Sequence, residues 1–127
     1  MREEFDSLGR VLVPKNKLWG AQTQRSIDNF KIGAPASMPV EIIESYAILK
    51  KAAAYANCKL SNLSEEKKEV IEIACNQIES GAFNEHFPLV IWQTGSGTQT
   101  NMNVNEVISN LVKQNCGYNI HPNDDVN

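Results

Sequence analysis

Two helix-length segments in the middle of the sequence constrain the fold most. Between residues 39 and 60, apolar side chains recur at steps of three and four, which is the period of an amphipathic helix. Turn residues and Pro39 precede this pattern, so we expect a helix from near Pro39 to about Lys59. Its predicted buried face consists of Ile42, Tyr46, Leu49, Ala53, Ala56 and Leu60.

A second helix is expected to begin at Ser64. Serine is a favoured N-cap, and the following Glu65 and Glu66 complement the positive end of a helix. Gly81 is placed to end this helix. The residues spaced four apart that form its predicted buried stripe are Val70, Ala74 and Ile78. The short connection between the two segments predicts an antiparallel helix pair.

The remaining patterns place shorter elements around this pair. Residues 11–20 alternate loosely around Pro14, which favours a short strand or a peripheral hairpin. The apolar run Phe87–Trp92 contains Pro88 and predicts a buried extended segment. A third helix is expected from about Thr98 to Lys113, with an apolar side made by Val104, Val107, Ile108, Leu111 and Val112. We therefore predict one mostly α domain over residues 1–127, with a short extended or hairpin element near the N-terminus.

Composition and charge exclude several classes of function. The chain is 42% hydrophobic and 21% charged, which fits a soluble globular protein without a membrane span. Its net charge of -3 and its scattered lysines argue against nucleic acid and anionic membranes as partners. The acidic N-terminus lacks the features of a signal or transit peptide, so we expect a cytoplasmic location. The three cysteines lack C-x-x-C spacing, so we expect neither a disulfide framework nor a metal site.

The stretch Thr94–Thr98 carries the strongest chemical signal. Two glycines and three hydroxyl side chains lie just ahead of the predicted third helix. Free N–H groups and the positive helix end favour a carboxylate or a phosphate, although a glycine turn with Thr98 as a helix cap is an equally good interpretation. The residues that follow include three poor helix formers, Asn101, Asn103 and Asn105. We expect their side chains to form a hydrogen-bonded structural network that also includes Glu106.

A second polar group lies near the end of the sequence. His121 to Asp124 combine an imidazole, an amide and a carboxylate, and a protonated histidine there could bind a small anion. The alternative is a turn in which Asn123 and Asp124 bond their own backbone, and the residues alone favour it. His86 stands near two phenylalanines and is interpreted as a packed or surface histidine.

These residues resemble class II fumarate hydratase, of the aspartase/fumarase superfamily. The resemblance rests on Phe87–Gln99, Asn101–Asn103 and Asn105–Val107, with Trp19–Phe30 upstream and His121–Asn127 downstream. Aspartate ammonia-lyase is the nearest competitor, but it typically has a Gly-Gly-Ala-Gly loop and no histidine before Pro-Asn-Asp. Thr94–Gly97 and His121 therefore favour the hydratase.

The resemblance implies the reversible hydration of fumarate to L-malate in the tricarboxylic acid cycle, without a metal or organic cofactor. It assigns Ser96, Gly97 and Thr98 to the binding of a substrate carboxylate. It assigns a second dicarboxylate site to His121, Pro122, Asn123 and Asp124, although Tyr118 stands where the family commonly has a basic residue. The family assembles as a homotetramer.

The resemblance also predicts which parts of an active site do not occur in this sequence. The family's serine-serine-asparagine motif, its histidine acid or base and its catalytic serine loop lie beyond the stretch that residues 1–127 match. We therefore expect an N-terminal domain that ends before the central helical bundle, contains no catalytic residue and is inactive alone. The alternatives are a non-catalytic dicarboxylate-binding module or an aspartate ammonia-lyase-like domain.

Overall fold

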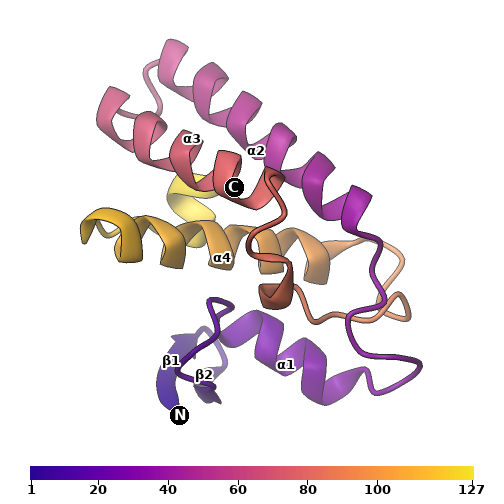
Figure 1. Ribbon diagram of the computed structural model, residues 1–127. Helices are drawn as coiled ribbons and strands as arrows, with labels where there is room; N and C mark the ends of the chain where they lie inside the picture. The colour runs from indigo at the N-terminus through magenta and orange to yellow at the C-terminus, as the bar shows by residue number, and fades with distance from the viewer.

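The computed structural model describes residues 1–127, and helices dominate it (Figure 1). The hairpin of β1 (Arg2–Asp6) and β2 (Gly9–Val13) is followed by α1 (Ala21–Asn29). The long helices are α2 (Val40–Lys59), α3 (Glu65–Glu79) and α4 (Thr98–Cys116). Two short turns complete the order: η1 (Asn84–His86) precedes α4, and η2 (Pro122–Val126) follows it. The predicted mostly α fold is confirmed.

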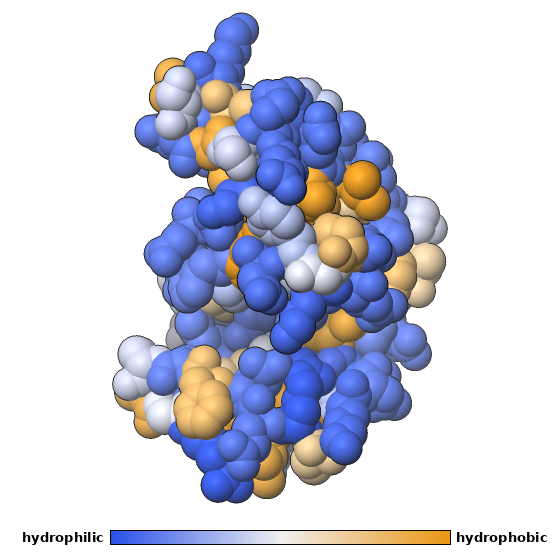
Figure 2. Space-filling model, turned by 90° about the vertical axis from the view of Figure 1, so that its left-hand side faces the viewer, coloured by the Kyte–Doolittle hydropathy of each residue, from blue (hydrophilic) through white to orange (hydrophobic).

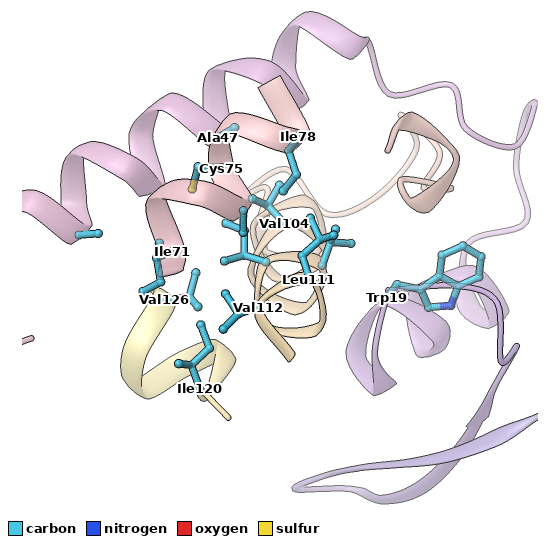
Figure 3. Close-up of a cluster of buried hydrophobic side chains, with 14 of the residues drawn as sticks. Trp19, Ala47, Ile71, Cys75, Ile78, Val104, Leu111, Val112, Ile120 and Val126 are labelled. Atoms are coloured by element: carbon cyan, nitrogen blue, oxygen red, sulfur yellow. The ribbon is translucent and has the colours of Figure 1, made fainter. Parts of the chain in front are cut away.

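Helix α4 occupies the centre of the molecule (Figure 1). It packs against α2 and α3 on one side and against α1 on the other, so the hairpin and α1 lie across α4 from the helix pair. The helix is almost wholly buried in its middle, where Val104, Val107, Ile108, Leu111 and Val112 are each 0% exposed. All five were predicted to form its apolar side, and all five belong to the core cluster that α4 shares with α3 and η2. Figure 3 labels Val104, Leu111 and Val112 in this cluster.

The helix boundaries follow the predicted capping residues closely. The Ser64 hydroxyl accepts a hydrogen bond from the Lys67 N–H at 3.1 Å and caps α3 as expected. Gly81, with a φ of 85°, lies just beyond the end of α3. Helix α4 runs three residues further than predicted, because it ends only where Gly117 adopts a left-handed φ of 71°.

The predicted buried face of α2 is wrong for four of its six residues, while Tyr46 and Ala53 are half-buried. Ile42, Leu49 and Leu60 are 42, 57 and 68% exposed, and Ala56 is exposed as well. The residues that α2 buries are Ile43, Ala47, Lys50 and Ala54. Apolar residues occur on both sides of this helix, so the period of three and four could not show which side packs inward.

The extended segments also differ from the prediction in part. The hairpin lies over residues 2–13 instead of 11–20, because Pro14 offers no N–H and the strand ends at Val13. In the run Phe87–Trp92, Phe87, Leu89 and Val90 are buried as predicted, whereas Ile91 and Trp92 are 52 and 64% exposed. Helix α1 has no counterpart in the sequence prediction, since its buried residues are only Ala21, Thr23 and Ser26.

Apolar groups are dispersed on the face shown in Figure 2, where several separate patches interrupt a largely hydrophilic surface. None of the helices combines the length and the apolar composition needed to cross a membrane. The structure also contains no cluster of three or more histidine, cysteine, aspartate or glutamate side chains placed to hold a metal ion.

Candidate functional site

The loop Thr94–Gly97 leads directly into the N-terminus of α4. Gly97 is the N-cap residue, with a left-handed φ of 75°, and its N–H donates to the Thr94 carbonyl at 3.3 Å. A glycine adopts this conformation without strain. Gly97 has no side chain to cap the helix, and the N–H groups of Thr98 and Gln99 make no hydrogen bond within the chain. Two donors at the positive end of α4 are therefore free to bind an anion.

Three hydroxyl groups form a continuous row beside these donors. The Ser96 hydroxyl lies 3.2 Å from that of Thr94 and 3.0 Å from that of Thr98. The Thr94 hydroxyl also donates to the Gln99 side-chain oxygen at 2.6 Å. All three hydroxyl residues are exposed, so their protons can turn towards a ligand. The structure thus brings together the predicted residues Ser96, Gly97 and Thr98 on one open surface.

The opposite side of Thr98 borders a cleft of about 260 Å³ between α1, the hairpin and α4. Arg25 of α1 lines this cleft, but its guanidinium donates to both carboxylate oxygens of Asp6, at 2.8 and 3.0 Å. These contacts hold the pKa of the Asp6 carboxyl below its usual value. The one positively charged side chain that lines this cleft is therefore already paired.

Two further side chains support the loop and α1, and sequence reasoning missed the role of both. The Gln93 amide oxygen accepts from the N–H and the hydroxyl of Thr100, at 3.1 and 3.0 Å. Glu106, in the middle of α4, accepts hydrogen bonds from the N–H groups of Gly20, Gln22 and Thr23, and from the Thr23 hydroxyl at 2.6 Å. The bonds of Gln93 span only seven residues, whereas those of Glu106 reach 83 to 86 residues along the chain.

The Glu106 carboxylate caps α1 in place of a local residue. Gly20 permits this approach, because a Cβ at that position would lie 2.6 Å from a Glu106 oxygen. Burial raises the pKa of Glu106, although its hydrogen bonds act in the opposite direction. The prediction that Glu106 belongs to a network with the asparagines is wrong, since its partners all come from the start of α1.

The three asparagines in the first half of α4, Asn101, Asn103 and Asn105, contact separate parts of the chain. Asn103 is buried and donates to the His86 carbonyl at 3.1 Å, and Asn101 donates to the Asn127 side chain at 3.1 Å. Asn105 reaches only the Met102 sulfur, at 3.6 Å, and its buried amide oxygen has no partner. The predicted hydrogen-bonded role is confirmed for Asn101 and Asn103.

The second predicted site is a capped turn at η2. The His121 Nδ1 accepts from the N–H groups of Asn123 and Asp124, both at 3.1 Å, and the Asp125 carboxylate accepts from the His121 N–H at 2.8 Å. These two hydrogen bonds occupy Nδ1, so only Nε2 of the ring is left for a ligand. Pro122 begins the turn. His121, Pro122 and Asn123 line a cleft of about 530 Å³ together with the acidic residues Glu4, Asp6 and Glu106.

The other candidate residues have structural surroundings. His86 is 5% exposed and accepts from the Leu18 N–H at 3.0 Å, so it is the packed histidine that the sequence allowed. Burial lowers the pKa of its imidazole. Lys50 is also buried, and its ammonium donates to the Asn127 side chain at 2.9 Å. All three cysteines are free thiols.

Comparison with known proteins places this arrangement in a family. A family model described as Lyase matches residues 9–127. The chain therefore belongs to the lyase family.

Its relatives are class II fumarate hydratases. The enzyme of Bacillus anthracis is 59% identical over 131 residues, and that of Haemophilus ducreyi is 55% identical over 132. Each match covers 99% of this chain and 28% of the relative. The resemblance predicted from the sequence is confirmed, and the chain spans 28% of the length of these relatives.

Solved structures agree with this assignment. The recombinant class II fumarase from Schistosoma mansoni superposes with a TM-score of 0.92 at 44% identity, over 99% of this chain and 28% of that one. The fumarate lyase:delta crystallin from Brucella melitensis, in native form, gives a TM-score of 0.91 at 40% identity, over 100% of this chain and 30% of that one.

Proposed function

We propose that this chain is the N-terminal domain of a fumarate hydratase and holds a substrate carboxylate at the start of α4. The observation that carries the proposal is the meeting of two free N–H groups with the hydroxyls of Ser96 and Thr98. A carboxylate has two oxygens and accepts hydrogen bonds only, so it matches a surface made of donors. The lyase family match and the fumarate hydratase relatives support a C4 dicarboxylate as the proposed ligand.

The proposed chemistry needs more than this loop supplies. Hydration of fumarate runs through a species with extra negative charge on one carboxylate, and fixed donors stabilise such charge best in a site closed to water. Residues 94–99 contain donors but no titratable side chain that could act as a general base at neutral pH. The loop therefore binds and orients, and the proton is transferred by groups outside residues 94–99.

We extend the same proposal to the assembly and location of the protein. The open loop would face residues supplied by the rest of the enzyme, and the family resemblance implies that these come from several subunits of a homotetramer. The expected location is the cytoplasm, and fumarate and L-malate are the expected partners. Every one of these points concerns the full-length enzyme.

Titration of the isolated chain tests the binding site directly. Fumarate, L-malate and L-aspartate are added to isotopically labelled chain, and amide chemical shifts are followed by NMR. Saturable shifts confined to residues 95–99 are expected with fumarate and L-malate, with millimolar affinity because the loop is open on one side. Thr98→Val keeps the side-chain shape and removes one donor, so it should weaken binding several-fold.

Two results of this titration would redirect the assignment. A preference for L-aspartate over L-malate would favour an aspartate ammonia-lyase-like domain. No saturable shift with any of the three, in wild type and Thr98→Val alike, would contradict a binding role for the isolated loop. The matched control is Ser61→Ala, because Ser61 carries an exposed hydroxyl in the connection between α2 and α3, away from the loop.

We propose a weaker dicarboxylate site at His121, Pro122, Asn123 and Asp124. The imidazole must cap its own turn and bind the ligand through Nε2 alone, and the carboxylates of Glu4 and Asp6 border the same cleft. Like charges in one cleft disfavour an added anion. In the titration above, shifts at residues 121–124 should therefore saturate at higher concentration than those at residues 95–99.

A further inference from the structure

The N-terminus of α4 is capped by a residue outside the helix. Thr100 is the third residue of α4, and its N–H is normally bound by the side chain of the N-cap residue. The N-cap residue here is Gly97, which has no side chain. The Gln93 amide oxygen accepts from this N–H at 3.1 Å and from the Thr100 hydroxyl at 3.0 Å. The Gln93 amide nitrogen donates to the Val90 carbonyl at 2.8 Å. One side chain therefore ties the extended segment before the loop to the first turn of the helix after it.

These contacts close the loop into a ring. Residues 94–99 run between two fixed points, Gln93 and Thr100, and all three hydroxyls of the row lie inside this stretch. Thr100 is 3% exposed, so water cannot easily replace Gln93 as its partner. The N–H groups left over for an anion are those of Thr98 and Gln99. Gln93 thus occupies the N–H of Thr100 and leaves those of Thr98 and Gln99 as the free donors of the helix end.

We propose that Gln93 is a positioning residue for the dicarboxylate site, acting through Thr100 and not by touching the ligand. This inference rests on the proposed function of the loop. A site whose donors are already fixed loses less freedom when the ligand binds, and small displacements of such donors weaken binding strongly. The hydroxyl row is exposed, and the bonds that Thr94 makes with Gln99 and Gly97 lie within the loop itself. The position of the row relative to the rest of the chain therefore depends on the closed ring.

The variants that test this inference differ in a single feature. Gln93→Met keeps the length of the side chain and removes all three hydrogen bonds. Thr100→Val removes only the bond of the hydroxyl and keeps the N–H. Gln77→Met is the matched control, because Gln77 is half-buried like Gln93 and its amide exchanges two hydrogen bonds with Asn115 on a distant part of the surface.

The first measurement is amide hydrogen exchange at Thr100 in the ligand-free chain. Loss of its hydrogen bond should speed exchange about fivefold in Gln93→Met, corresponding to roughly 1 kcal/mol. The N–H bond persists in Thr100→Val, so the change there should be smaller, and Gln77→Met should show none. Unchanged exchange in Gln93→Met would overturn the inference at its structural step. This measurement needs no ligand and is independent of the proposed function.

The second measurement uses a fusion protein in which this chain replaces the matching N-terminal region of the Bacillus anthracis fumarate hydratase. Gln93→Met should raise KM for fumarate about ten- to hundredfold with a smaller change in kcat, since the loop binds substrate and transition state alike. Faster exchange with an unchanged KM would show a purely structural cap and overturn the positioning role. If Thr98→Val also leaves KM unchanged, the proposed function itself fails.

Discussion

Replacement of Glu106 by glutamine tests how the start of α1 is held against α4. The carboxylate of this α4 residue accepts four hydrogen bonds from Gly20, Gln22 and Thr23 and so fixes the start of α1. Glutamine has the same shape, but one of its two terminal atoms is a donor. If its oxygen keeps the three bonds of Oε1, its NH₂ group faces the N–H of Gln22, and two donors then meet in a buried place.

The expected loss of stability follows from these contacts. A hydrogen bond to a charged group contributes about 1.5–3 kcal/mol and a neutral one about 1 kcal/mol. Losing one bond and weakening three therefore removes roughly 5 kcal/mol. Removal of a charge that is costly to bury returns several kcal/mol of this. We expect Glu106→Gln to lower the free energy of unfolding by about 1–3 kcal/mol at neutral pH. The loss should be greater below the ordinary pKa of the carboxyl, because protonated Glu106 buries no charge and its hydroxyl oxygen still accepts from the Gln22 N–H, which a glutamine NH₂ group cannot do.

The pH dependence gives a sharper test of the same contact. Burial raises the pKa of Glu106, so the folded protein holds this proton at pH values where the unfolded chain has lost it. The stability that Glu106 contributes is then largest below its ordinary pKa and declines as pH rises towards the folded value. The decline amounts to about 1.4 kcal/mol for each unit by which the pKa is raised.

Urea unfolding of wild type and Glu106→Gln, at about five pH values between about 3.5 and 7.5, measures the stability difference between the two proteins. The advantage of wild type over the variant should shrink with rising pH. The control Glu69→Gln removes an exposed carboxylate that has no hydrogen-bond partner, and it should stay within about 0.5 kcal/mol of wild type at every pH. An advantage that grows with pH would refute the reasoning.

Three further predictions concern the core, the hairpin and the thiols. Ile43→Ala should lower the free energy of unfolding by about 2–5 kcal/mol, because Ile43 is 3% exposed. Leu49→Ala should change it by less than about 0.5 kcal/mol, because Leu49 is 57% exposed, and urea unfolding compares the two variants. Arg25 lowers the pKa of Asp6, so the stability advantage of wild type over Asp6→Asn should be full at neutral pH. The advantage should disappear as pH falls through the folded pKa of Asp6, and urea midpoints measured against pH test this. A maleimide should modify the exposed Cys116 and leave Cys75 unmodified, because burial raises the pKa of the Cys75 thiol to about 12. Mass spectrometry of peptides measures the labelling, and equal labelling of the two thiols would contradict the burial of Cys75.

The elements that could be predicted from the sequence are those with local signals. Ser64, Gly81 and the apolar period define α3 within a few residues, because capping and periodicity act between near neighbours. Helix α1 carries no such signal: it buries an alanine, a threonine and a serine, and its cap is Glu106, over 80 residues away. The inward face of α2 likewise depends on its neighbours, which is why Lys50 is buried while Leu49 is not.

The candidate site divides in the same way. Ser96, Gly97 and Thr98 could be found from the sequence because glycines and hydroxyls cluster before a helix start. The free donors of Thr98 and Gln99, and the bonds of Gln93 that leave them free, depend on backbone conformations that the sequence pattern does not determine. For His121, the capping of its own turn became visible only from the positions of the Asn123 and Asp124 N–H groups.

The central claim is that the start of α4 binds the carboxylate of a fumarate hydratase substrate. Fumarate hydration by the fusion with the Bacillus anthracis enzyme tests it most directly, read as the loss of ultraviolet absorbance of fumarate. The account predicts turnover by the fusion, none by the isolated chain, and at least about a tenfold fall in kcat/KM when Ser96 and Thr98 are replaced by alanine and valine. Full activity of that double variant, or turnover by the isolated chain, would contradict it.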